Sequence, residues 1–210
     1  MIRRLSVILF VLGVSLVSYN GWQYYESTRS VQEIPDQKDA PSIDTVKANE
    51  QETRDTVNKE STREASVSPM TFDYNIAKGE EVAELDIPKL DKRFTTYWGT
   101  DEDTLGQGVG MYVSEWTTIP NREGGHTVLS GHRDTVFIGL DELGEGDTLE
   151  VHYDDETFVY KIKETWITDA EDRSVIVEKD KPTLTLTTCY PFNYVGYAPD
   201  RYIVQAELVD

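Results

Sequence analysis

One cysteine in the chain stands where it could act as a nucleophile. Cys189 follows residues 183–188, in which leucine and threonine alternate as they do in a β-strand. Pro191 cannot donate to a strand ladder, so this strand should end at about Cys189 or Tyr190. A second predicted strand starts at Arg201, and if the two strands pair, Arg201 lies close to Cys189. A thiol at a strand end beside a fixed cation is suited to nucleophilic attack.

A histidine stands in a similar position elsewhere in the chain. Residues 128–134 read Val-Leu-Ser-Gly-His-Arg-Asp, which is an apolar strand ending at Gly131 with His132 after it. A lone cysteine is more often a small buried hydrophobic residue than a catalyst, so this histidine matters to the interpretation. A cysteine and a histidine, each at the end of its own strand, are the minimum requirement for acyl transfer through a thioester.

These segments resemble the motifs of the sortase family. Leu-Ser-Gly-His-Arg-Asp (129–134), Thr-Leu-Thr-Thr-Cys-Tyr-Pro-Phe (185–192) and Ala-Pro-Asp-Arg-Tyr-Ile-Val (198–204) occur in the family's order and at similar spacing. Tyr-Pro-Phe after the cysteine, followed by Ala-Pro, is similar to the class D sortases of spore-forming Gram-positive bacteria. The resemblance covers roughly residues 83–209, the whole expected domain.

The resemblance implies a chemistry and a role for each of three residues. Cys189 would be the nucleophile, His132 the acid and base, and Arg201 the electrostatic clamp on the substrate carbonyls and the oxyanion. The protein would be a cysteine transpeptidase that cleaves surface proteins after the threonine of a C-terminal LPxTG-like sorting signal. It would transfer them to an amine of peptidoglycan or its lipid-linked precursor. No cofactor and no metal are expected.

Three further residues are candidates for binding the sorting signal. The segment 167–182 is the longest connection leading into the cysteine strand, so we expect it to form the wall that reads the Leu-Pro part of the signal. Ile176 and Val177 are its apolar candidates, and Thr188 stands directly before the nucleophile.

Two other classes of protein must be weighed against a sortase. An L,D-transpeptidase also uses Cys and His, but its cysteine usually follows Ser-x-Gly and precedes Arg, whereas here Thr-Thr precedes Cys189 and Tyr190 follows it. The other alternative is a non-catalytic cell-wall-binding module with a buried cysteine. The rate at which a thiol reagent labels Cys189 would separate a module from an enzyme.

Short alternating segments predict an all-β catalytic domain over residues 70–210. Eight short strands favour a closed β-barrel, because closure removes exposed strand edges, and the sortase resemblance implies the same fold. Short helices are expected at residues 101–106 and 137–143. The expected strands are residues 82–87, 93–98, 106–113, 126–130, 148–153, 157–165, 183–189 and 202–209.

Two segments precede this domain. Residues 5–25 carry no charge and follow Arg3 and Arg4, which predicts a single-pass transmembrane signal anchor over residues 1–25. The N-terminus would be cytoplasmic and the catalytic domain extracellular. A cleaved signal peptide is the competing interpretation, but no small-x-small cleavage site follows the apolar run. Residues 26–69 lack a sustained apolar pattern and predict an acidic, disordered linker.

Composition excludes several other functions. The net charge of −19 is opposite to that of a nucleic-acid-binding protein. Three histidines and one cysteine do not make a zinc constellation, and one cysteine cannot form an internal disulfide. His126 and His152 lie within alternating strands, and we expect them to be strand residues with hydrogen-bond partners rather than catalysts.

Overall fold

The computed structural model describes residues 2–34, 76–192, 194 and 196–209. Contacts divide the chain into two units, of which residues 1–34 and 70–210 form one and residues 35–69 the other. Most of the predicted linker therefore lies outside the described residues.

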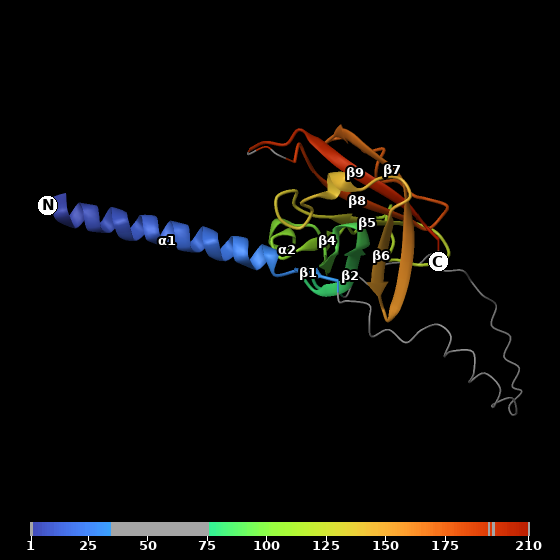
Figure 1. The fold of residues 1–210 in the computed structure, drawn as a ribbon, viewed down its shortest axis with the longest axis horizontal. Coiled ribbons are helices and arrows are strands. Elements are labelled where there is room, and N and C mark those ends of the chain that lie inside the picture. The colour runs from blue at the N-terminus through green and yellow to red at the C-terminus, as the bar shows by residue number, and fades with distance from the viewer. Residues whose placement is uncertain (1, 35–75, 193, 195, 210) are drawn as a thin grey trace, which may run out of the picture. The chain divides into compact units, whose positions relative to one another are not determined.

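Eight strands close into a mixed β-barrel (Figure 1). Their order around the ring is β3-β2-β6-β7-β9-β8-β5-β4, and a pairing of β4 with β3 closes it. The β3–β4 and β5–β8 pairs are parallel and the other pairs are antiparallel. The predicted eight-stranded barrel is confirmed. The strands are β2 (Glu81–Ile87), β3 (Lys92–Trp98), β4 (Val109–Met111), β5 (His126–Ser130), β6 (Thr148–Tyr153), β7 (Glu156–Asp169), β8 (Thr183–Tyr190) and β9 (Asp200–Leu208).

The cysteine strand is covered on both of its faces. Leu184 and Leu186 are fully buried in the apolar core of the barrel, as their alternation predicts. Thr183 and Thr185, on the alternate face, are also buried. The leucine face of this strand is therefore buried in the core, and its threonine face is buried as well. Neither face of the strand is open to solvent over these residues.

Helices are few and short within the barrel. α2 (Glu102–Leu105) occupies the first predicted helix, and Asp101 caps it by accepting a hydrogen bond from the Thr104 backbone N–H at 3.3 Å. The second predicted helix is reduced to the 3₁₀ turn η4 (Leu140–Glu142), because Gly139 before it has φ of 85° and cannot continue a helix. A further 3₁₀ turn, η3 (Pro88–Leu90), joins β2 to β3.

The segments before the barrel differ from what the sequence predicts. A helix, α1 (Ile2–Thr28), covers the predicted anchor, yet no helix in the described part of the chain has the length and apolar character needed to cross a membrane. The predicted transmembrane span at residues 5–25 is therefore not confirmed.

The predicted linker also contains a strand. β1 (Val31–Glu33) pairs antiparallel with β3, where Val31 lies opposite Phe94. Val31 is partly buried against the core of the barrel. Ordered chain therefore extends beyond Glu26, where the linker is predicted to begin, and residues 35–69 lie outside what the structure describes.

Candidate active site

Strand pairing brings Cys189 and Arg201 together. β8 and β9 pair antiparallel over eight positions, from Thr183 opposite Glu207 to Tyr190 opposite Asp200, and Cys189 lies directly opposite Arg201. Both side chains are half-buried. The two strands therefore pair as the sequence predicts, and directly opposed residues in a sheet have neighbouring side chains.

The turn after β5 is fixed against the cysteine strand just before the thiol. β5 runs parallel to β8, with Ser130 opposite Thr187. The backbone N–H of Gly131 donates to the Thr187 carbonyl at 3.2 Å, and the Thr188 hydroxyl donates to the Gly131 carbonyl at 2.7 Å. His132 follows Gly131, so these two hydrogen bonds of Gly131 place His132 at the level of Cys189.

One cavity of about 390 Å³ contains all three predicted catalytic side chains. Cys189, His132 and Arg201 line it from β8, from the end of β5 and from β9. Thr188 and Ile176 line it too, although the Thr188 hydroxyl is already engaged by Gly131. Val177 is not among the residues that line this cavity and lies in an adjacent hollow.

The Arg201 guanidinium is held by backbone oxygens. Its Nη1 donates to the carbonyls of Ala198 at 3.2 Å and Asp200 at 3.0 Å. Among the described residues no ion pair joins it to a carboxylate, so its charge is not neutralised there. A guanidinium that is oriented but not neutralised can stabilise a negative oxygen that develops nearby.

A buried histidine ties the wall of the cavity to the barrel. β7 extends to Asp169, so the connection into β8 is residues 170–182, shorter than predicted. His126 Nδ1 is 2.8 Å from the Val177 carbonyl in this connection, and Nε2 is 2.7 Å from the Thr185 hydroxyl. A carbonyl only accepts, so Nδ1 carries the proton and Nε2 accepts from Thr185. Burial lowers the pKa of His126 to about 4, which keeps the ring neutral. The prediction of a partnered strand residue is confirmed.

Sequence reasoning assigned no role to Arg133. Its Nη1 donates to the Pro191 carbonyl at 2.8 Å, and its Nη2 donates to the carbonyls of Tyr194 at 2.8 Å and Gly196 at 3.0 Å. One side chain beside His132 thus holds three carbonyls of the connection that follows Cys189. The only indication in the sequence was that Arg133 lies between His132 and Asp134 in the Leu-Ser-Gly-His-Arg-Asp motif. That position does not show which oxygens its guanidinium binds.

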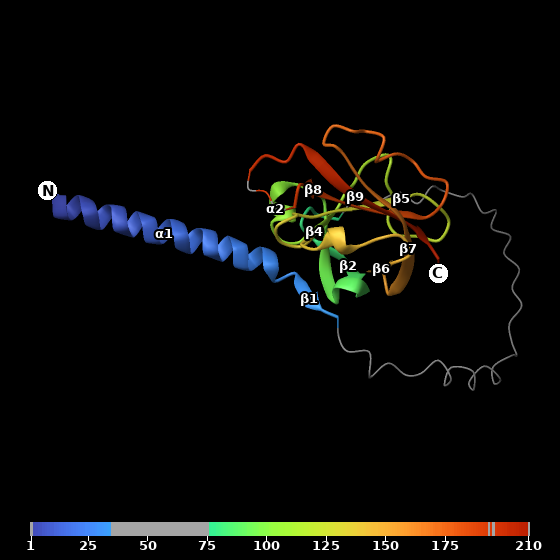
Figure 2. The ribbon, with the colours of Figure 1, turned by 45° about the horizontal axis from the view of Figure 1, so that its top comes forward.

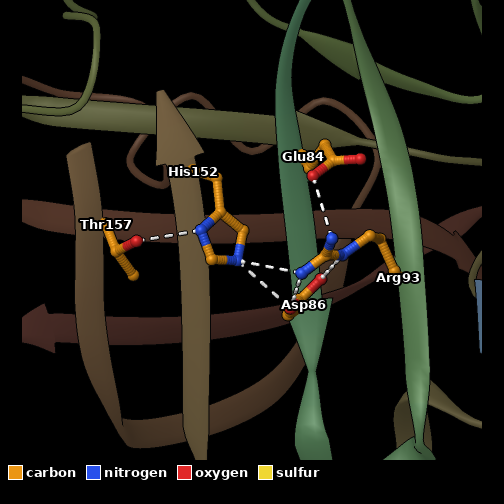
Figure 3. Close-up of polar contacts among 5 residues, drawn as sticks. All are labelled: Glu84, Asp86, Arg93, His152 and Thr157. Atoms are coloured by element: carbon orange, nitrogen blue, oxygen red, sulfur yellow. Dashed lines mark hydrogen bonds and ion pairs between the residues drawn. The ribbon is translucent and has the colours of Figure 1, made fainter. Parts of the chain in front are cut away.

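A separate polar cluster lies on β2, β3, β6 and β7 (Figure 3). Arg93 binds both oxygens of the buried Asp86 at 2.7 Å, His152 Nε2 lies 3.1 Å from Asp86, and His152 Nδ1 lies 2.9 Å from the Thr157 hydroxyl. Burial by itself raises the pKa of Asp86, but the hydrogen bonds from Arg93 and His152 outweigh it and leave that pKa below its usual value. The prediction that His152 has partners is confirmed.

This cluster contains donors of the kind that bind metal ions. Ligand atoms of Asp86, Glu150 and His152 lie within 4.8 Å of one another. Both Asp86 oxygens already accept hydrogen bonds from Arg93, so the guanidinium stands where a divalent cation would need to bind. The set therefore favours an internal ion pair over a metal centre.

Comparison with known proteins agrees with the motifs. The family model described as the sortase domain matches residues 85–209, which is more than half of the chain. Sortase D of Bacillus subtilis (strain 168) is 37% identical over 207 residues, which cover 96% of each chain. These matches favour a sortase over an L,D-transpeptidase.

Solved structures show the same relationship. The catalytic domain of B. anthracis SrtD is 57% identical to this chain, and the match covers 68% of this chain and 97% of that one with a TM-score of 0.57. Sortase C of Clostridium perfringens, solved with the C-terminal cell wall sorting motif, is 29% identical over 65% of this chain and 74% of that one, with a TM-score of 0.58. The protein therefore belongs to the sortase family of cysteine transpeptidases, and to its class D.

Proposed function

We propose that this sortase cleaves proteins after the threonine of a C-terminal sorting signal resembling Leu-Pro-x-Thr-Gly and joins them to an amine of cell-wall peptidoglycan or its lipid-linked precursor. The observation that carries the proposal is the cavity lined by Cys189, His132 and Arg201 together. The sorting motif found with the C. perfringens relative supports the class of substrate.

The first half-reaction makes a thioester. The Cys189 thiol gives its proton to His132, and the resulting thiolate attacks the threonyl carbonyl carbon; the carbonyl oxygen becomes an oxyanion that Arg201 stabilises by donating hydrogen bonds. The C–N bond then breaks, and His132 gives its proton to the departing amine. The part of the substrate before the cut remains bound to Cys189 as a thioacyl group.

The second half-reaction returns the free thiol. The acceptor amine attacks the thioester carbonyl while His132 takes a proton from it, and Arg201 again stabilises the oxyanion. Collapse of this intermediate breaks the C–S bond and leaves the new amide, and the released Cys189 thiolate takes the proton back from His132. Water in place of the amine gives hydrolysis by the same steps.

The β7–β8 connection supports the predicted substrate contacts unequally. Ile176 lines the cavity beside Cys189 and offers an apolar surface to the Leu-Pro part of the signal. Thr188 acts there through its backbone and methyl group, because its hydroxyl is bonded to Gly131. Val177 contributes from the adjacent hollow, and its carbonyl anchors the connection to His126.

Mass spectrometry of the protein with a panel of Leu-Pro-x-Thr-x peptides tests the proposal. We expect an adduct whose mass equals the peptide up to and including threonine, located on Cys189. Cys189→Ala should give no adduct, because the chain has no other thiol. His132→Ala should slow turnover by roughly 10²–10⁴-fold, the usual range for a general acid and base. His152→Gln, outside the cavity, is the matched control; equal losses in both histidine variants would contradict the role given to His132.

The location of the enzyme is a second part of the proposal. Sortases act outside the cell at its envelope, and we place residues 70–210 there with the N-terminus in the cytoplasm. Attachment through residues 5–25 rests on Arg3 and Arg4 before an uncharged run, since no described helix meets the requirements of a span. Protease added to intact protoplasts should digest the catalytic domain. Complete protection would contradict this placement, and release of a soluble mature domain would indicate a cleaved signal.

A further inference from the structure

A second hollow adjoins the cavity that contains Cys189. It has a volume of about 880 Å³ and lies between the β4–β5 connection, which supplies Tyr112 and Trp116, and residues 170–173 and 176–178 of the β7–β8 connection. We call it the outer groove. Four residues line both spaces: Tyr112, Ala170, Asp172 and Ile176. A polypeptide that leaves the catalytic cavity past these residues therefore enters the outer groove directly.

The outer groove combines an apolar surface with negative charge. Trp116 is 51% exposed although it is a large aromatic residue. Glu171, Asp172 and Glu178 carry three negative charges in the lining, against one positive charge on Arg173, which leaves −2. Carboxylates beside an exposed indole ring suit a ligand with both cationic and apolar groups.

The walls of the outer groove are held in place by hydrogen bonds. Asp172 accepts hydrogen bonds from Ser174 and Thr168, which also keep its pKa below the usual value, so this carboxylate is ionised at neutral pH. The opposite wall is tied by the Thr117 hydroxyl, which donates to the Tyr112 carbonyl at 3.0 Å. A preformed groove loses little conformational entropy when a ligand binds.

We propose that the outer groove binds the segment of the substrate protein that precedes the sorting motif, and that it prefers a segment carrying basic residues. The inference rests on the proposed function, since it assigns a site to the acyl side of that substrate. The acyl side stays bound to Cys189 in the thioester, whereas the other side must leave before an amine can enter. Contacts in the outer groove thus persist through both half-reactions without obstructing the exchange.

The test compares peptides that share one Leu-Pro-x-Thr-x core. Four kinds of peptide are assayed with the full-length protein: the core alone, and the core extended on its N-terminal side by four residues containing two Lys, two Gln or two Glu. A further peptide carries four residues containing two Lys after the core. We expect kcat/KM to be about fivefold higher for the Lys extension than for the Gln extension, and lower again for Glu. The effect should lie in KM rather than kcat, and it should shrink at high salt.

Two sets of variants locate the effect. Glu171→Gln combined with Glu178→Gln should remove most of the preference for Lys, and Trp116→Ala should weaken every extended peptide while leaving the core peptide unchanged. Asp141→Asn combined with Glu145→Gln removes two exposed charges elsewhere and is the matched control for net charge. An equal loss of preference in the control would overturn the inference, because it would show a general effect of the acidic protein.

The outcomes separate this inference from the proposed function. If the wild-type protein does not turn over any core peptide, the proposed function fails. If it turns over the core but is indifferent to the charge of the N-terminal extension, the proposed function stands and the outer groove has no such ligand. A charge effect found only when the two Lys follow the core would also overturn the inference, because the groove would then serve the leaving side.

Discussion

Acid should destabilise this protein through His126. Burial holds the pKa of His126 at about 4, below the ordinary value of 6.5. Between these two values the histidine of the unfolded chain takes up a proton that folded His126 does not. The unfolded state then binds more protons, so the free energy of unfolding falls as the pH falls through this window.

The two pKa values set the size of the effect. They predict a loss of about 2 kcal/mol between pH 7 and pH 5, and about 3 kcal/mol between pH 7 and pH 4. The lowered pKa values of Asp86, Asp101, Asp147 and Asp172 act below this window, because each carboxylate loses its stabilisation only as the pH falls from its usual 3.8. The loss between pH 7 and pH 5 should therefore be mostly that of His126.

A matched variant isolates this contribution. His126→Asn keeps an N–H close to the position of Nδ1, where it can still donate to the Val177 carbonyl, but it does not titrate. Urea denaturation of both proteins at several pH values gives the difference in their free energies of unfolding. We expect the free energy of unfolding of the wild type, relative to that of His126→Asn, to fall by about 2 kcal/mol from pH 7 to pH 5. A difference that stays constant over this range would refute the reasoning.

Three further predictions concern arginines. Arg201→Ala should lower kcat roughly 10²–10³-fold with little change in Tm, and Arg201→Lys should restore little of the activity because an ammonium group lacks the two parallel N–H donors of a planar guanidinium. Near-normal turnover with a lower Tm would show that Arg201 is a structural residue. Arg133→Ala should lower kcat about tenfold and make the connection after Cys189 more susceptible to proteolysis. Arg133→Lys should not fully restore either property, because one ammonium group cannot bind three carbonyls. Unchanged susceptibility to proteolysis would contradict the role of Arg133 in holding this connection. Arg93→Met should cost about 3 kcal/mol in urea denaturation because buried Asp86 loses its main partner, whereas Glu84→Gln, at the exposed edge of that cluster, should cost less than about 0.5 kcal/mol.

The strands of the barrel could be predicted because each one has its own alternating pattern and its own turns. The ends of the strands were harder to predict from the sequence, because pairing with a strand that is distant along the chain determines where each strand stops. β7 continues to Asp169 because it keeps pairing with β9 as far as Asp200. Trp166, Ile167 and Thr168 favour a strand, but the sequence does not show the partner that fixes where the strand ends. β1 was missed for the same reason, because three residues in a polar segment become a strand only where the edge of β3 accepts them.

The site was predictable to the extent that it depends on strand ends. The Cys189–Arg201 pair follows from two adjacent strands, one of which ends where the other begins. The role of Arg133 and the link from His126 to Val177 depend on backbone carbonyls of connections. Every residue has a carbonyl, so the sequence carries no mark of which ones are used. The two histidines outside the catalytic cavity were recognisable only as strand residues, without the identity of their partners.

The place of β9 in the ring has a consequence for how the enzyme matures. β9 is the last strand in the described part of the chain, yet it lies between β7 and β8 and not at an edge (Figure 2). A chain that emerges N-terminus first, from a ribosome or an export channel, keeps two open strand edges until residues 200–208 are free. Arg201 arrives on this same strand. The thiol therefore acquires its cation in the step that closes the barrel, and no partly emerged chain has a complete active site.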